Sequence, residues 1–92
     1  MGYDFEWDPA KAGSNRRKHG VEFREATTVF ADPRAMNMPD PMHSLVEERF
    51  TLLGLSNRGR LLVVCYTERP PRTRIITARR ATTRERRQYE SA

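Results

Sequence analysis

The chain has 92 residues, of which 37% are hydrophobic and 32% charged, so one domain over residues 1–92 with a modest core is expected. Its formal net charge is +5, and it shows no run of 18 apolar residues and no apolar leader, which argues against a membrane-spanning helix and a secretory signal. The single cysteine, Cys65, excludes an internal disulfide and lies in an apolar run. We therefore expect a buried thiol in a cytoplasmic protein.

The positive charge is concentrated at one end of the chain. Residues 58–92 contain ten arginines, three glutamates and no lysine, a net charge of +7, whereas residues 1–57 carry a net charge of −2. A guanidinium group matches phosphate with two parallel hydrogen bonds and stays charged at any relevant pH. An arginine-rich end on a small chain therefore indicates nucleic acid as the partner.

A strand and two helices are predicted in the first third of the chain. Aromatic and acidic residues alternate over residues 3–7, which is the pattern of a half-buried strand. Asp8-Pro9 is typical of a helix start, and we expect this helix to run to His19 and to stop at Gly20. Apolar residues at helical spacing predict a second helix over residues 23–30.

Four more strands and a last helix are predicted after residue 34. The strands are expected at residues 35–39, 49–55, 61–69 and 72–78. Arg58-Gly59 is a candidate two-residue hairpin turn with glycine at a positive φ, and residues 61–65 are apolar on both faces, which makes their strand central. Thr82 and Glu85 match a capping box that opens a short helix. The order β-α-α-β-β-β-β-α indicates an α+β fold, with a mainly antiparallel sheet and helices packed against it.

Several short motifs recur in one order along the chain. The first are Phe5-Glu6-Trp7-Asp8-Pro9-x-Lys11 and Asn15-x-x-Lys18-His19-Gly20-Val21-x-Phe23. The later ones are Glu47-Glu48-Arg49-Phe50, Tyr66-Thr67-Glu68-Arg69 and Arg74-Ile75-Ile76-x-Ala78-Arg79-Arg80-Ala81-Thr82. In this arrangement the chain resembles the BrnT family of toxin proteins over nearly its whole length. It departs from the family pattern at Thr77, where serine is common, and at Pro70-Pro71, which replaces a more usual polar turn.

This resemblance implies a RelE-like ribonuclease toxin that cleaves RNA and slows translation. It also implies a BrnA-type antitoxin with a ribbon-helix-helix DNA-binding domain, so that promoter DNA is contacted only through the antitoxin. The substrate would be RNA, free or on the ribosome. No cofactor and no membrane partner are implied.

Metal-independent RNA cleavage uses the 2′-hydroxyl of the substrate as nucleophile, so the protein has to stabilise charge and transfer protons. We assign these tasks to Arg79, Arg80, Glu48, Tyr66 and His43. Contacts to the RNA backbone are assigned to Lys11, Lys18, Arg49, Arg69 and Arg74. This hypothesis requires Arg74, Arg79 and Arg80 to converge on one exposed concavity. No metal site is expected, because the histidines and Cys65 lack ligand spacing.

Each assignment has a structural alternative. Arg79 could pair with Glu47, Glu48 or Glu68, Tyr66 could pack in the core, and His19 is expected to cap the carbonyls of its helix. A two-residue turn at Arg58-Gly59 would place Arg49 opposite Glu68 as a cross-strand ion pair. A second function therefore stays open at this point: a non-catalytic nucleic-acid-binding module with an arginine-rich C-terminal surface.

Overall fold

The computed structural model describes residues 4–38 and 48–92, and it has the predicted α+β fold and order of elements. The strands are β1 (Phe5–Glu6), β2 (Met36–Met38), β3 (Phe50–Leu55), β4 (Leu61–Arg69) and β5 (Arg72–Arg80). The helices are α1 (Pro9–His19), α2 (Phe23–Thr28), the 3₁₀ turn η1 (Val29–Ala31) and α3 (Thr83–Ser91). The loop predicted after residue 38, with His43 in it, lies outside the described residues.

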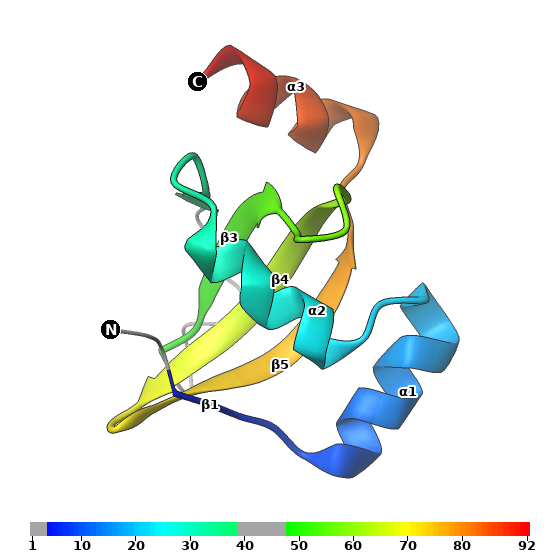
Figure 1. Cartoon of the computed structure of the whole chain (residues 1–92), viewed down its shortest axis with the longest axis vertical. Helices are drawn as coiled ribbons and strands as arrows, with labels where there is room; N and C mark the ends of the chain where they lie inside the picture. The colour runs from blue at the N-terminus through cyan, green and yellow to red at the C-terminus, as the bar shows by residue number, and fades with distance from the viewer. Residues whose placement is uncertain (1–3, 39–47) are drawn as a thin grey trace.

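The five strands form one sheet in the order β1-β5-β4-β3-β2 (Figure 1). All neighbours are antiparallel except β1, which pairs parallel with the start of β5 through Phe5–Thr73 and Glu6–Arg74. The prediction of β4 as the central strand is confirmed, and so is β2 as an edge strand.

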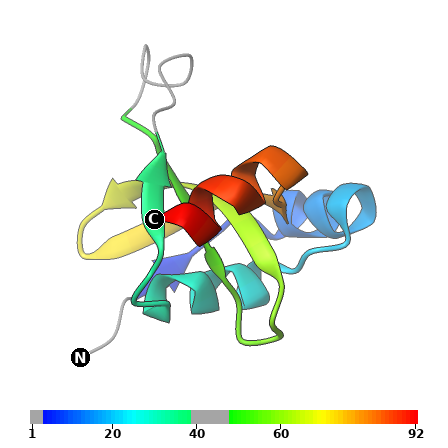
Figure 2. The same cartoon turned by 90° about the horizontal axis from the view of Figure 1, so that it is seen from above.

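Apolar residues on the two faces of β4 pack into two separate hydrophobic cores. Leu62 and Val64 pack with Phe23 and other buried residues under α1 and α2, whereas Leu61 and Val63 pack on the opposite face with Tyr89 of α3. Figures 1 and 2 show α3 lying across one end of the sheet, away from α1. The alternation of side chains along a strand explains why one apolar run can serve both faces.

Helix α1 has the predicted ends but almost no apolar face. The Asp8 carboxylate accepts from the Ala10 N–H at 2.9 Å, and Gly20 closes the helix with φ 69°. The only buried residue of α1 is Asn15, whose amide accepts from the Ala78 N–H and donates to the carbonyl of Ala78. A polar side chain, rather than an apolar stripe, therefore ties this helix to β5.

The hairpin between β3 and β4 turns over three residues, not two. The Gly59 N–H donates to the Ser56 carbonyl at 3.0 Å, the Ser56 N–H donates to the Arg60 carbonyl, and Gly59 has φ 75°. This is the geometry of a turn followed by a residue in the left-handed region, which lengthens the loop by one. Phe50 therefore pairs with Tyr66, and the predicted placement of Arg49 opposite Glu68 is wrong.

Strand β5 contains one extra residue relative to β4. Cys65 pairs with Thr77 and Tyr66 pairs with Ile75, so Ile76 has no register partner and forms a bulge. The predicted alternation along this strand consequently breaks at Ile76. Ile75 and Ala78 both enter the core under the helices, while Arg74, Thr77 and Arg79 share the opposite face.

Two carboxylates, one buried and one half-buried, fasten loops to this framework. Glu25 of α2 is 6% exposed and accepts from Ser56 Oγ at 2.7 Å and from Arg60 Nε at 2.9 Å, which clamps the hairpin turn. Asp32, after η1, accepts from the Leu55 N–H at 2.8 Å and from the Tyr89 hydroxyl at 2.6 Å. The hydrogen bond from the Tyr89 hydroxyl to Asp32 anchors α3.

Candidate nucleic-acid interface

Most of the C-terminal arginines are paired with carboxylates. Arg58 and Arg60 both face Glu25, and Arg74 meets Glu6 at 2.9 Å. The further pairs are Arg72–Asp4 at 3.6 Å, Arg79–Glu85 at 2.9 Å and Arg86–Glu90 at 3.8 Å. A cation that already faces a carboxylate contributes little to the outward field. The arginine count of this region therefore overstates the charge that a polyanion would meet.

The expectation that Arg74, Arg79 and Arg80 converge on one concavity is wrong. Arg74 and Arg79 share a face, but they are five residues apart on β5, about 17 Å of extended chain. Arg80 pairs with Leu62 of the core under the helices, so it points to the face opposite Arg79. The bulge and the ion pairs, neither of which local sequence reveals, separate the three guanidinium groups.

Arg79 joins β5 to α3 through a two-pronged ion pair. Its two terminal nitrogens donate to the two carboxylate oxygens of Glu85, each at 2.9 Å, and Glu85 also accepts from the Thr82 N–H in the predicted capping box. The Arg79 guanidinium lowers the pKa of Glu85 to about 2, against the opposing effect of burial. The partner of Arg79 is thus Glu85, not one of the three glutamates considered from the sequence.

Tyr66 lies on the other face of the sheet from Arg79. It is 8% exposed, stacks on Phe50 at 5.4 Å and meets Phe30 edge-on at 4.9 Å. Its hydroxyl accepts from Asn37 Nδ2 at 3.1 Å and borders a cavity of about 190 Å³ that Glu68 also lines. This placement fits core packing, the structural alternative, and it keeps Tyr66 away from Arg79.

The other expected site residues do not gather around Arg79 either. The Glu48 side chain is exposed, and its carbonyl accepts from Thr67 Oγ1 at 2.7 Å, beside the Thr67–Arg74 pair. Arg69 is exposed at the far end of β4, Arg49 is half-buried before β3, and His43 lies outside the described residues. Glu48, Arg49 and Arg69 belong to the end of the sheet that carries Arg74.

The cations that lack an ion pair within residues 4–38 and 48–92 lie elsewhere. Four of them belong to α1, one to α2, one to the turn before β2 and three to the end of β5 and to α3: Lys11, Arg16, Arg17, Lys18, Arg24, Arg34, Arg80, Arg84 and Arg87. All nine are exposed. The outward positive charge is therefore shared between the first helix and the last helix, although the sequence places its excess only at the C-terminal end.

A groove runs between α1 and the free edge of β5. It has a volume of about 250 Å³ and is lined by Lys11, Ser14, Asn15, Lys18, His19, Ile76 and Thr77. Lys11 and Lys18 are seven residues apart, close to two helical turns, and therefore lie on one side of α1. Thr77 is exposed and shares its face of β5 with Arg79, about 7 Å further along the strand. We call this feature the α1–β5 groove.

His19 does not cap α1 as expected. The helix ends with the Gly20 N–H donating to the Arg16 carbonyl at 2.8 Å, and within the described part of the chain the His19 ring makes no hydrogen bond. His19 instead lines the groove beside two lysines. Sequence reasoning missed this role, together with Ser14 and Thr77, although Lys11, Ser14 and Lys18 follow the i, i+3, i+7 spacing of one helix side.

Within residues 4–38 and 48–92, no three His, Cys, Asp or Glu side chains come close enough together to hold a metal ion. In the same ranges no helix has the length and apolar character needed to cross a membrane. Cys65 is only half-buried, which corrects the expectation of a buried thiol.

The fold and the α1–β5 groove define a small basic α+β protein suited to a polyanionic ligand. A family model described as "Ribonuclease toxin, BrnT, of type II toxin-antitoxin system" matches residues 7–85. The chain therefore belongs to the BrnT family of ribonuclease toxins from type II toxin–antitoxin systems, as the motifs predicted.

Comparison of structures agrees with this assignment. The crystal structure of the Brucella abortus ribonuclease toxin BrnT is similar with a TM-score of 0.67 and 20% sequence identity, over 88% of this chain and 99% of that chain. At this identity the likeness establishes the shared fold. No curated protein sequence matches the chain.

Proposed function

We propose that this toxin cleaves RNA without a metal ion, by attack of the substrate 2′-hydroxyl on the adjacent phosphate. The nucleophile and its target are then held in one molecule, which removes the need for a protein nucleophile. The protein has to neutralise the charge that develops on the phosphate. It also has to accept a proton from the 2′-hydroxyl and to donate a proton to the leaving 5′-oxygen.

The observation that supports this proposal is the composition of the α1–β5 groove. Lys11 and Lys18 flank it without a carboxylate partner among the described residues, so both ammonium groups are available to a phosphate. His19 supplies an imidazole, the side chain that proteins use most often for general acid–base catalysis. The Ser14 and Thr77 hydroxyls add neutral hydrogen-bond donors at the same place.

Of the residues expected to be catalytic, Arg80 fits a phosphate clamp best, because it is exposed and has no ion pair among the described residues. Arg79 would have to leave Glu85 in order to bind phosphate. Glu48, Tyr66 and His43 remain candidate catalytic residues in this proposal, and alanine substitution of each would test them by the cleavage assay described below.

The proposed partner is a BrnA-type ribbon-helix-helix antitoxin, and the proposed consequence of cleavage is arrest of translation on free or ribosome-bound messenger RNA. Both rest on membership of the family. An antitoxin that covers the α1–β5 groove with acidic side chains would exclude RNA and neutralise the exposed cations of α1 at once. Contact with promoter DNA would pass through the antitoxin.

The test is cleavage of end-labelled RNA in the presence of EDTA. The expected products carry a 5′-hydroxyl and a 2′,3′-cyclic phosphate, and an RNA with 2′-O-methyl groups should stay intact. His19→Gln should slow cleavage about 10²–10⁴-fold if His19 transfers the proton, and Lys11→Ala/Lys18→Ala should weaken binding. Arg86→Ala, an exposed and weakly paired cation of α3, is the matched control.

Two results would contradict the proposal. Cleavage that stops in EDTA and returns with magnesium would remove the metal-independent mechanism. RNA that binds tightly but is never cut would make this chain a non-catalytic nucleic-acid-binding module instead.

A further inference from the structure

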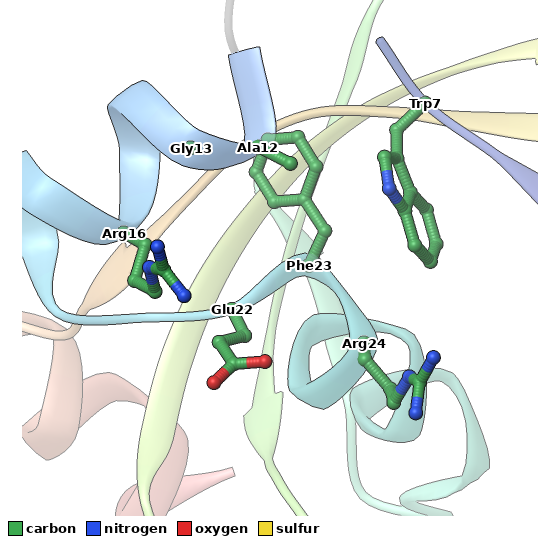
Figure 3. A pocket seen from close by; sticks show the side chains of 7 residues that line it. All are labelled: Trp7, Ala12, Gly13, Arg16, Glu22, Phe23 and Arg24. Carbon is green, nitrogen blue, oxygen red and sulfur yellow. The ribbon is translucent and has the colours of Figure 1, made fainter. Parts of the chain in front are cut away.

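A second cleft opens on the other side of α1, between this helix and α2. It has a volume of about 440 Å³ and is formed by Trp7, Arg16, Glu22, Phe23 and Arg24, with Ala12 and Gly13 of α1 as its wall (Figure 3). The groove described above uses Lys11, Ser14 and Lys18, on the opposite side of the same helix. Nothing in the proposed cleavage chemistry uses this second cleft.

An aromatic surface borders the cleft. Trp7 meets Phe23 edge-on, with ring centroids 6.1 Å apart and an interplanar angle of 77°. Phe23 is fully buried, but Trp7 is only half-buried and lines the cleft. A half-buried indole at the wall of a polar cleft is the kind of side chain on which an unpaired nucleobase stacks.

Charged groups surround this platform. Arg16 comes from α1 and Arg24 from α2, both exposed, and neither forms an ion pair within the described ranges. Figure 3 shows the two guanidinium groups on either side of the Glu22 carboxylate. Two cations can hold the phosphates that flank a stacked base, while a carboxylate accepts hydrogen bonds from the edge of a base.

The cleft is also connected electrostatically to the α1–β5 groove. Lys11 and Lys18 lie on one side of α1, Arg16 on the other, and the helical period of 100° per residue places Arg17 on the outer surface between them. All four cations are exposed and unpaired among the described residues. A strand bound in the groove can therefore cross α1 over a continuous row of cations. The half-buried indole of Trp7 at the far end of this row favours RNA over an acidic protein segment as the occupant.

We propose that the α1–α2 cleft is a nucleobase subsite that binds one unpaired guanine of the RNA substrate next to the cleavage groove. Guanine is favoured because its adjacent N1–H and N2–H can both donate to the Glu22 carboxylate, whereas adenine, cytosine and uracil present only one such nitrogen at that edge. This inference rests on RNA being the substrate, as proposed above.

Trp7 is the only tryptophan of the chain, so its fluorescence reports on the cleft directly. The experiment titrates the full-length protein with short 2′-O-methyl oligoribonucleotides that cannot be cleaved and that contain one guanine in a uridine background. Saturable quenching of Trp7 is expected. Replacing the guanine by an abasic site should weaken binding about 5- to 150-fold, the range measured for loss of stacking on one base.

Variants then separate the parts of the subsite. Arg24→Ala should weaken binding of the guanine-containing oligonucleotide several-fold. Glu22→Gln should remove the preference for guanine over adenine. Arg86→Ala should leave both unchanged, and equal melting temperatures would show that the variants remain folded. Trp7 emission that stays constant while labelled RNA is shown to bind would overturn the subsite, and so would an equal response to all four bases.

The two proposals can fail separately. Guanine-dependent quenching without any cleavage of ordinary RNA would retain the subsite and remove the ribonuclease mechanism. Cleavage of RNA without any change in Trp7 fluorescence would retain the ribonuclease mechanism and remove the subsite. If the antitoxin alone changes Trp7 emission and RNA does not, the cleft is a protein-binding surface and the nucleobase proposal is wrong.

Discussion

The side-chain amide of Asn15 pairs with both backbone groups of Ala78, donating to the carbonyl at 2.8 Å and accepting from the N–H at 3.1 Å. The same amide donates to the Val21 carbonyl at 3.0 Å. Strand β1 pairs with β5 only at Thr73 and Arg74, so the backbone groups further along this edge of β5 need other hydrogen-bond partners. At Ala78 the Asn15 side chain takes the place of a neighbouring strand. The position of α1, and with it of Lys11, Lys18 and His19, depends on this contact.

Asn15→Ala should therefore lower the free energy of unfolding by about 2–3 kcal/mol, because it leaves buried backbone groups of Ala78 and Val21 without partners. Denaturant melts would measure the loss. Cleavage should fall further than the folded fraction predicts, since the α1–β5 groove loses its alignment. Asn15→Asp, which keeps an acceptor but removes the donors, should not rescue stability. Wild-type stability in Asn15→Ala would contradict this role.

Replacing Glu25 should have a larger effect than replacing Arg58, the exposed one of its two arginine partners. Glu25 is buried and receives Arg60 and Ser56, so Glu25→Ala leaves the Arg60 guanidinium and the hairpin turn uncompensated and should cost about 3–5 kcal/mol. The control is Arg58→Ala, whose side chain is 67% exposed at 3.8 Å from Glu25 and should cost well under about 1 kcal/mol. Thermal melts of both variants would test the ordering, which equal losses would disprove.

The protein should become less stable at acidic pH because Glu25 and Glu85 then become protonated. The Arg60 hydrogen bond lowers the pKa of Glu25, and the Arg79 hydrogen bond lowers the pKa of Glu85 to about 2, from ordinary values of 4.5. A lowered folded-state pKa contributes stability above the unfolded value that is lost as the pH falls towards the folded value. The melting temperature should thus decline between about pH 5 and pH 2. Glu85→Gln should start lower at pH 7 and show a shallower decline, and parallel curves for wild type and variant would refute the assignment.

Helix α3 should loosen when the Tyr89 hydroxyl is removed. Tyr89 donates to Asp32 at 2.6 Å, and this bond, together with burial, raises the pKa of Tyr89. Burial alone would raise the pKa of Asp32, but the hydrogen bonds from Tyr89 and from the Leu55 and Arg34 N–H groups lower it. Tyr89→Phe keeps the ring in its core but should cost about 1.5–3 kcal/mol, the range for a hydrogen bond to a charged group. Hydrogen exchange should quicken in α3 and stay unchanged in α1. An equal change in hydrogen exchange in α1 and α3 would show that the hydrogen bond to Asp32 does not anchor α3.

Local chemistry in the sequence predicted the element ends well. Asp8-Pro9, Gly20 and the Thr82–Glu85 capping box act within a few residues of themselves, so their effect does not depend on tertiary structure. The apolar run 61–65 similarly predicted the central strand, because only a strand covered on both faces buries every residue of such a run.

The site was predicted less well because it depends on register and on distant partners. Gly59 at positive φ suits both a two-residue and a three-residue turn, and one residue of difference moved Arg49 out of line with Glu68. The bulge at Ile76 has no local signature and redirects every arginine after it. The pairing of Arg74 with Glu6 joins residues 68 positions apart, which no local pattern reveals.

The internal pairing of the arginines also sets how this toxin should respond to ionic strength. Only a cation that exchanges a condensed counterion for a phosphate contributes to the salt slope of single-strand binding, about 0.7 per contact. Those already facing Glu6, Glu25 or Glu85 displace none. For a chain with a formal charge of +5 and a sequence pI of about 10.1, the affinity for RNA should therefore fall less steeply with salt concentration than the composition suggests.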